Sequence, residues 1–218
     1  AMEPLLAAGK DVLCIAFSSG LSNTYNAAAV AVQELSQKYP ERKIYAVDSL
    51  CASLGQGLLV DYAVRMKEAG KSMEETAQWV QDHLQNICHL FTVDDLKYLQ
   101  RGGRISKTTA LLGTMIGIKP VLHVDEEGKL VPLSKVRGRK QSIQALVDKM
   151  EQNIGSYRSQ KQPIFISHGD CEEDAKYLAG LVKERFGYNE CLINIIGPTI
   201  GAHAGPGTLA LFFLGDVR

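Results

Sequence analysis

A cluster of hydroxyl side chains occupies residues 18–24, where an apolar segment gives way to a helical pattern: Ser18-Ser19-Gly20-Leu21-Ser22-Asn23-Thr24. The first N–H groups of a helix have no partner within it and carry the positive end of its dipole, which stabilises a bound anion by about 0.3–1 kcal/mol. Gly20 lets the backbone approach a ligand closely, and the hydroxyls add donors. The turn therefore suits a carboxylate or a phosphate. A Ser22 or Thr24 that only caps the helix would explain the same residues.

The same hydroxyls could instead serve a nucleophilic enzyme. The chain lacks the G-x-S-x-G nucleophile elbow, and it also lacks the glycine-rich phosphate loops G-x-x-x-x-G-K-[ST] and G-x-G-x-x-G. A serine-dependent hydrolase or a small-molecule kinase thus rests only on the hydroxyl cluster. Anion binding without catalysis explains the turn better, and a regulatory interaction module without a ligand stays open as a further alternative.

Basic residues form two more candidate groups. A glycine turn carries Arg101, Arg104 and Lys107, which would suit an anion or an acidic partner. Arg137 and Arg139, with Lys140, stand ahead of a helical pattern. Because positive charge at a helix start opposes the dipole, we expect these side chains to serve something other than helix stability.

The predicted secondary structure around these groups alternates between strands and helices. In the first half, strands are predicted over 12–17, 43–47 and 89–93 and helices over 25–35, 54–66 and 72–85, the last opened by a Ser72-Met73-Glu74-Glu75 capping box. The first two strands and their helix fit a βαβ crossover in a parallel sheet.

The pattern of residue types changes at residue 94, where the second half of the chain begins. Short helices are predicted over 94–99 and 108–115, a hairpin over 118–123 and 130–136 with Pro132 on an edge strand, helices over 142–153 and 172–186, strands over 163–167, 191–196 and 209–214, and an irregular loop over 197–208. We therefore expect a two-lobed α/β protein, with a parallel-type sheet flanked by helices in residues 1–93 and a mixed sheet in residues 94–218.

Composition narrows the class of protein. The 218 residues contain 24 basic and 24 acidic side chains, so no broad electrostatic attraction to nucleic acid is expected. Five scattered cysteines without a C-x-x-C pair suggest neither a zinc site nor a disulfide framework. No apolar run reaches the ~18–20 residues that a membrane span requires, and no secretory signal is recognisable. We expect a cytoplasmic protein without a cofactor.

Six segments in order resemble the DegV family of bacterial fatty-acid-binding proteins. They begin at Ser18, Val47, Val93, Ile118, Val136 and Ile200 and read SSGLSNTY, VDS, VDDLKYLQRGGRIS, IKPVLH, VRGRK and IGAHAGPGT. The resemblance runs through almost the whole chain, and six ordered motifs are far more specific than any one of them.

That resemblance implies a non-enzymatic carrier that holds one long-chain fatty acid in a buried tunnel and presents its carboxylate to an ATP-dependent fatty-acid kinase. By the same resemblance, Ser22 hydrogen-bonds the carboxylate with Ser19 nearby, and Arg101 and His203 complete the polar network. Arg137 and Arg139 match a basic patch expected to meet the kinase.

One departure from the family pattern affects the first lobe. Family members start with a strand carrying Asp-Ser-Thr and continue with a Thr-Ser-Gln-Pro-Ser segment, and neither is present in this sequence. The chain therefore resembles a fragment that lacks about a quarter of a typical family domain. Its first sheet is expected to have an unpaired edge, and its carboxylate site to have one hydroxyl fewer.

Overall fold

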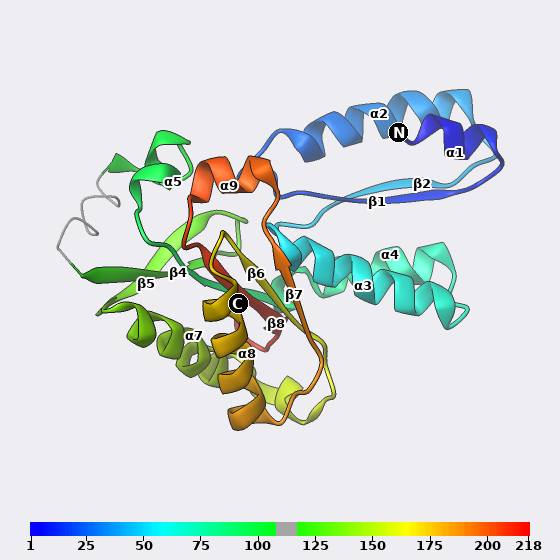
Figure 1. Cartoon of the computed structure of the whole chain (residues 1–218). Coiled ribbons are helices and arrows are strands. Elements are labelled where there is room, and N and C mark those ends of the chain that lie inside the picture. Colours follow the sequence, from blue (N-terminus) through cyan, green and yellow to red (C-terminus); the bar gives the residue numbers. More distant parts are fainter. Residues whose placement is uncertain (108–116) are drawn as a thin grey trace.

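The computed structural model describes residues 1–107 and 117–218, so the helix predicted over 108–115 lies outside the described residues. Figure 1 shows an elongated unit formed by the first part of the chain and a larger unit around a second sheet. The predicted α/β class, with a small parallel sheet and a larger mixed sheet, is confirmed.

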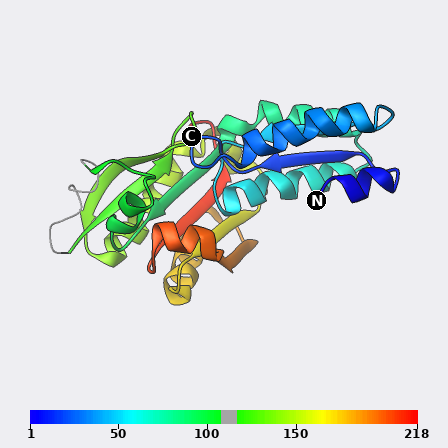
Figure 2. The same ribbon diagram turned by 90° about the horizontal axis from the view of Figure 1, so that it is seen from above.

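The elongated unit is built on a two-stranded parallel sheet. Its elements are α1 (Glu3–Ala7), β1 (Val12–Ala16), α2 (Thr24–Lys38), β2 (Ile44–Asp48), α3 (Leu54–Glu68) and α4 (Met73–Asp82). Strands β1 and β2 pair in parallel from Val12 opposite Ile44 to Ala16 opposite Asp48, which confirms the predicted crossover. In the described part of the chain no third strand joins this sheet. Strand β1 lies between α2 and α3 (Figure 2).

Helix α3 links the two units because its apolar stripe faces the larger sheet. Leu58, Leu59 and Ala63 are buried at the helical spacing that the sequence shows. Helix α4 begins at the predicted capping box, in which Ser72 Oγ accepts from the N–H of Glu75 and the Glu75 carboxylate accepts from the N–H of Ser72.

The larger unit is a mixed sheet with helices on both faces. Its elements are η1 (Leu84–Asn86), β3 (Ile87–Thr92), α5 (Lys97–Arg101), β4 (Ile118–Val124), β5 (Leu130–Arg137), α7 (Arg139–Asn153), η2 (Gly155–Ser159), β6 (Ile164–His168), α8 (Glu172–Phe186), β7 (Cys191–Ile195), α9 (Pro198–Ala204) and β8 (Leu209–Leu214). Among the described residues the strand order is β5-β4-β3-β8-β6-β7, with only the β6–β7 pair parallel.

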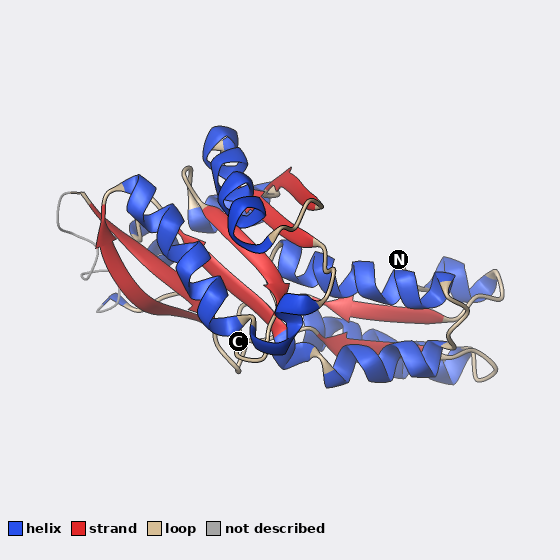
Figure 3. Cartoon of the chain, turned by 90° about the horizontal axis from the view of Figure 1, so that it is seen from below, coloured by secondary structure: helices blue, strands red, loops and turns tan. Residues whose placement is uncertain are grey.

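Two apolar cores lie on opposite faces of this sheet. Helices α7 and α8 cover one face (Figure 3). Their residues Ile143, Leu146 and Leu178 are fully buried in the core that they form with this sheet. Helix α3 covers part of the other face, where its buried residues share a core with Phe91 of β3 and Phe212 of β8. The central strands β3 and β8 are buried throughout, as strands covered on both faces should be.

The predicted hairpin is confirmed as β4 and β5. Strand β5 is an edge strand, which explains how it accommodates Pro132, a residue that cannot donate to a ladder. The register shifts at Val121 and Leu122, opposite this part of β5. The turn of the hairpin contacts the hydroxyl turn at residues 18–20.

The prediction of an irregular loop over 197–208 is wrong for the first half of that range, because residues 198–204 form helix α9. Pro198 occupies the first turn, where its missing N–H costs nothing, and the helix ends at Gly205, whose φ is +80°. The glycines therefore mostly flank the helix. Helix α7 also begins earlier than predicted, so Arg139 and Lys140 belong to its first turn.

The division of the chain after residue 93 stays a prediction. Strand β3, which precedes that point, pairs with β4 and β8 in the larger sheet. Within the residues that the structure describes, no helix is long and apolar enough to cross a membrane.

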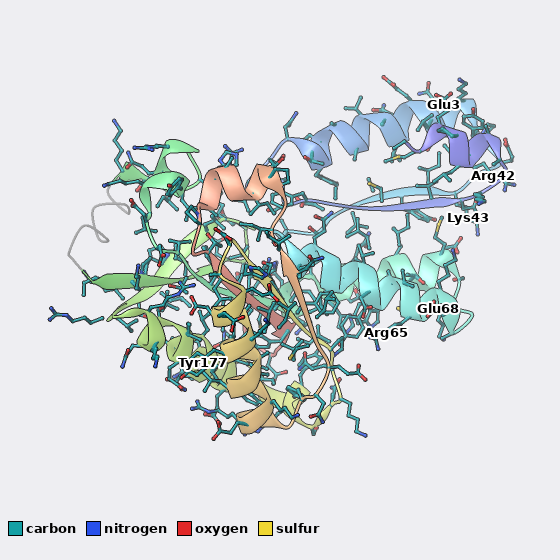
Figure 4. All side chains as sticks on the ribbon, viewed as in Figure 1. Glu3, Arg42, Lys43, Arg65, Glu68 and Tyr177 are labelled. Atoms are coloured by element: carbon teal, nitrogen blue, oxygen red, sulfur yellow. The ribbon has the colours of Figure 1, made fainter. Side chains whose placement is uncertain are left out.

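The end of the elongated unit farthest from α9 is rich in exposed ion pairs. Figure 4 shows Glu3, Arg42 and Lys43 gathered there. Glu3 pairs with Lys38, and Lys43 pairs with Glu74. Exposed pairs of this kind contribute little to stability, and their charges are already matched. These ion pairs therefore give no indication of a ligand site.

Candidate functional site

In the hydroxyl turn after β1, Ser18 has a structural role. Ser18 is fully buried, and its hydroxyl donates to the carbonyl oxygen of Gly128 at 2.8 Å and accepts from the N–H of Gly20 at 3.1 Å. Its own N–H donates to the carbonyl of Cys51 at 3.0 Å. Ser18 therefore joins the turn to the hairpin and is not available to a ligand.

A carboxylate of the chain itself already occupies part of this turn. Asp48 Oδ1, at the end of β2, accepts from the N–H groups of Ser19 and Leu50, each at 3.1 Å. The side chain of Ser19 is exposed. The backbone donors of the turn therefore do not all converge on one external anion.

Ser22 and Thr24 supply the hydroxyls that face a cavity. Their Oγ and Oγ1 atoms are 2.8 Å apart, and the N–H of Thr24 donates to Ser22 Oγ at 3.3 Å. Both residues line a cavity of about 340 Å³ between the turn, α9 and the sheet. Most of its wall is apolar, and these side chains are Phe17, Leu21, Ala52, Phe91, Leu99, Val124, Leu130, Ile196, Ile200, Ala204, Ala210 and Phe212.

Arg104 brings a positive charge to the Ser22 side of this cavity. Its Nε and Nη2 atoms donate to the carbonyl of Leu21 at 3.1 and 2.9 Å, and Nη1 donates to the carbonyl of Gly102. A guanidinium has five N–H donors, and these three bonds hold the group in place; among the described residues, the other two donors have no partner. Because Leu21 precedes Ser22, the charge lies beside the hydroxyl pair.

His203, on α9, lines the same cavity and packs against the backbone of Gly102. Its Nδ1 atom is buried and, among the described residues, has no hydrogen-bond partner. Buried polar atoms in native proteins usually have a partner, so an unsatisfied one that lines a cavity is a candidate ligand contact. Arg104 and His203 both contact Gly102, which places them at the same end of the cavity as Ser22.

The sheet contributes a neutral histidine to the cavity. His89 is 2% exposed; its Nδ1 lies 2.9 Å from the carbonyl of Ile87, and its Nε2 lies 3.3 Å from the N–H of Ala52. Nδ1 must then donate and Nε2 accept, which defines the neutral tautomer. Burial, and then the positive charge of Arg218, hold the pKa of His89 well below its ordinary value of 6.5.

The residues just before α3 form part of the cavity wall that the elongated unit contributes. Ser53 precedes that helix with φ of 50°, which is uncommon for a residue other than glycine. Its hydroxyl lies 3.0 Å from Ser167 Oγ on β6, and both residues line the cavity. A hydrogen bond between the two units thus forms part of the wall.

The residues predicted from the sequence fall into two groups. Ser22 and His203 line the cavity, whereas Ser19 and Arg101 are exposed and are not among the described residues that line it. Of the basic pair, Arg137 is exposed. Arg139 is engaged within the chain, with its Nε 2.8 Å from Asp174 Oδ2.

Sequence reasoning missed several residues of the wall. Arg104 stands three residues after Arg101 in the same glycine turn, and no local signal distinguishes the two arginines. His89 reads as an ordinary core histidine. Thr24 belongs to the quoted hydroxyl cluster, whereas Ser53 and Ser167 are isolated serines whose contact only the fold creates.

Comparison with known proteins identifies relatives over the whole chain. The family model described as "Uncharacterised protein, DegV family" matches residues 1–216. A DegV domain-containing protein of Clostridium perfringens is 47% identical over 218 residues, which cover 100% of this chain and 74% of that relative.

Two solved structures share the fold. A DegV family protein from Thermus thermophilus, described as binding fatty acid, superposes with a TM-score of 0.84 at 28% identity, covering 98% of this chain and 74% of that one. The fatty acid kinase B3 protein of Streptococcus pneumoniae, loaded with linoleic acid, superposes with a TM-score of 0.86 at 25% identity, covering 98% of this chain and 76% of that one.

Proposed function

The chain belongs to the DegV family, and we propose that it binds one long-chain fatty acid in the cavity between the 18–24 turn, α9 and the larger sheet. The observation that carries the proposal is the combination of an apolar wall with a polar end formed by Ser22, Thr24, Arg104 and His203. The fatty-acid ligands of the two solved relatives support it.

The physical chemistry of the cavity agrees with an acyl ligand. Transfer of each methylene group from water to an apolar wall contributes about 0.8 kcal/mol, so the tail would supply most of the affinity. Ordering of the chain and desolvation of the carboxylate reduce that gain. The hydroxyls of Ser22 and Thr24 and the remaining donors of Arg104 would then determine which end of the ligand faces the turn.

The carboxylate is the group on which a kinase would act. The Streptococcus pneumoniae relative is named as a fatty acid kinase B protein, which supports a carrier that presents its ligand to a separate kinase. Within this proposal Arg137, which is exposed, is the better placed of the two predicted arginines to meet a partner. Ser19 and Arg101 remain proposed contributors near the mouth, with less support from their positions.

No observation favours a serine hydrolase. Ser18 is engaged with Gly128, and among the described residues no hydrogen bond joins a serine of the 18–24 turn to a histidine. Within the described part of the chain, the hydrolase alternative therefore has no serine–histidine hydrogen bond of the kind that activates a nucleophile.

Lipid extraction followed by mass spectrometry of the purified protein tests the proposal. We expect a co-purifying fatty acid, or uptake of added palmitate or oleate, and faster loss of that ligand from Ser22→Ala. The matched control is Ser36→Ala on the exposed face of α2. Absence of both bound lipid and uptake would overturn the proposal, and turnover of an ester substrate that Ser22→Ala removes would favour the hydrolase.

A further inference from the structure

Arg139 is enclosed by other elements of the larger unit, although its sequence position suggests a surface residue. It lies in the first turn of α7, and only 21% of its side chain is exposed. Its Nε donates to Asp174 Oδ2 on α8 at 2.8 Å, and its Nη1 lies 3.7 Å from Asp94 Oδ1 in the loop after β3. Two carboxylates thus surround a charge that would otherwise oppose the dipole of α7.

A thiol connects this guanidinium to the cavity wall. Arg139 Nη2 donates to Cys171 Sγ at 3.5 Å, and the Cys171 thiol donates to the carbonyl of Thr208 at 3.3 Å. Burial raises the pKa of the Cys171 thiol, which keeps the proton needed for that bond in place. Thr208 lines the cavity, so the chain of contacts runs from α7 to the ligand site.

Thr208 in turn holds the end of α9. Its hydroxyl lies 2.8 Å from the carbonyl of Gly205 and 3.1 Å from that of Ala204, the last residue of the helix. Such bonds satisfy carbonyls that a helix end leaves without an intrahelical partner. Helix α9 carries His203, which stands at the polar end of the cavity.

Asp94 forms a second connection to the same segment. It pairs with Lys119 at 2.6 Å as well as with Arg139. A Cβ atom on Gly207 would lie 2.2 Å from Asp94 Oδ2, so the carboxylate is in direct contact with the backbone one residue before Thr208. Arg139 is therefore connected to residues 204–208 by hydrogen bonds through Cys171 and, more weakly, by an ion pair with Asp94 in which Nη1 makes no hydrogen bond to a described residue.

Only a planar guanidinium makes these contacts together. Its donors point in several directions from one rigid group, whereas the ammonium of lysine is a single compact charge. A lysine could keep the ion pair with Asp174 but could not also contact the Cys171 thiol and the Asp94 carboxylate.

We propose that Arg139 is a positioning residue of the cavity, which holds residues 204–208 and thereby α9 in place and slows the escape of the bound ligand, instead of contacting a partner protein. The ligand part of this inference rests on the proposed fatty-acid binding. Arg137, two residues earlier and exposed, is left as the residue of this pair that meets a partner.

Three variants of the full chain test the inference. Arg139→Lys keeps the positive charge but loses the planar set of guanidinium donors. The double variant Arg139→Gln with Asp174→Asn removes one charge from each partner of the ion pair, so that neither partner is left as an unpaired buried charge. Arg185→Gln is the matched control, because Arg185 is an ion-paired arginine at the opposite end of α8, with its Nη1 2.5 Å from Asp148.

Amide exchange in lipid-free protein is the first measurement. The N–H groups of Gly205 and Gly207 donate to Gly201 and Gly169 at 2.8 and 2.7 Å and should be protected in the unaltered protein. We expect faster exchange at both in Arg139→Lys and in the double variant, and no change in Arg185→Gln. Exchange in β1 and β2, which lie outside the network, should stay as it was.

The dissociation rate of a fluorescent long-chain fatty acid is the second measurement. We expect an increase of about tenfold in Arg139→Lys with a melting temperature close to that of the control variant. Unchanged exchange at Gly205 and Gly207 in both Arg139 variants would overturn the inference. If the unaltered protein holds no fatty acid, the proposed function fails, and the exchange measurement alone decides the role of Arg139.

Discussion

The imidazole of His203 lies directly against the backbone of Gly102: a Cβ atom built on that glycine would be 2.0 Å from His203 Nδ1. The contact joins the end of α5 to α9 across the polar end of the cavity. Gly102 has φ of −72° and ψ of −7°, a conformation that any residue adopts. The glycine is therefore required for space and not for backbone freedom.

Gly102→Ala should displace the His203 ring and weaken retention of a fatty acid, because the new methyl group cannot share that position. The measurement is the dissociation rate of a fluorescent fatty acid. Gly180→Ala on α8 is the control, since no atom lies within 4 Å of its added Cβ, and it should stabilise the protein by about 0.5–1 kcal/mol. Equal retention in both variants would contradict a ligand role for His203.

Ser18→Ala should destabilise the fold by about 1–3 kcal/mol, because the carbonyl of Gly128 would lose its buried donor and the N–H of Gly20 its acceptor. Urea unfolding of lipid-free protein measures the change, with the exposed Ser36→Ala as control. A loss no larger than that of the control would mean that the turn is held by other contacts.

Arg104→Gln should weaken fatty-acid retention more than Arg65→Gln, in which an exposed arginine paired with Asp61 on α3 is changed. The reason is that Arg104 places its charge beside Ser22, whereas Arg65 lies outside the cavity. Displacement of a fluorescent fatty acid by palmitate measures both. A larger effect from Arg101→Gln than from Arg104→Gln would restore the assignment that the sequence suggested.

Stability should fall as the pH decreases through about 6.5. Burial holds the pKa of His89 below that value in the folded protein, so the unfolded chain binds the extra proton first. For one such group the free energy of unfolding decreases by at most about 1.4 kcal/mol per pH unit between the unfolded and folded pKa values. The pKa of His123 is also lowered, chiefly by burial, and adds in the same direction.

Urea unfolding at pH 7.5 and 5.5 measures this dependence. His89→Gln should flatten it, because glutamine keeps a donor and an acceptor but does not titrate in this range. An identical slope in the variant would assign the dependence to other groups.

Much of the fold follows from local pattern. Apolar spacing predicts α8 at its observed bounds, and the Ser72 capping box marks the start of α4. Pro132 correctly indicates an edge strand. The pattern fails at α9, where glycine content alone suggests a loop, because packing against α5 and the bonds from Thr208 stabilise a short helix that intrinsic propensity disfavours.

The amino-acid sequence alone was enough to recognise the family, to predict the succession of strands and most of the helices, and to locate a hydroxyl turn that contains Ser22. Which neighbours of Ser22 share its cavity depends on how distant segments pack: Arg104 lines the cavity, and Arg101 is not among the described residues that do. Packing likewise encloses Arg139 between Asp94 and Asp174. Helices and strands form largely through residues a few positions apart, so a local pattern can predict them. A binding site instead depends on side chains brought together by packing between distant segments, and a one-dimensional pattern carries no information about that packing.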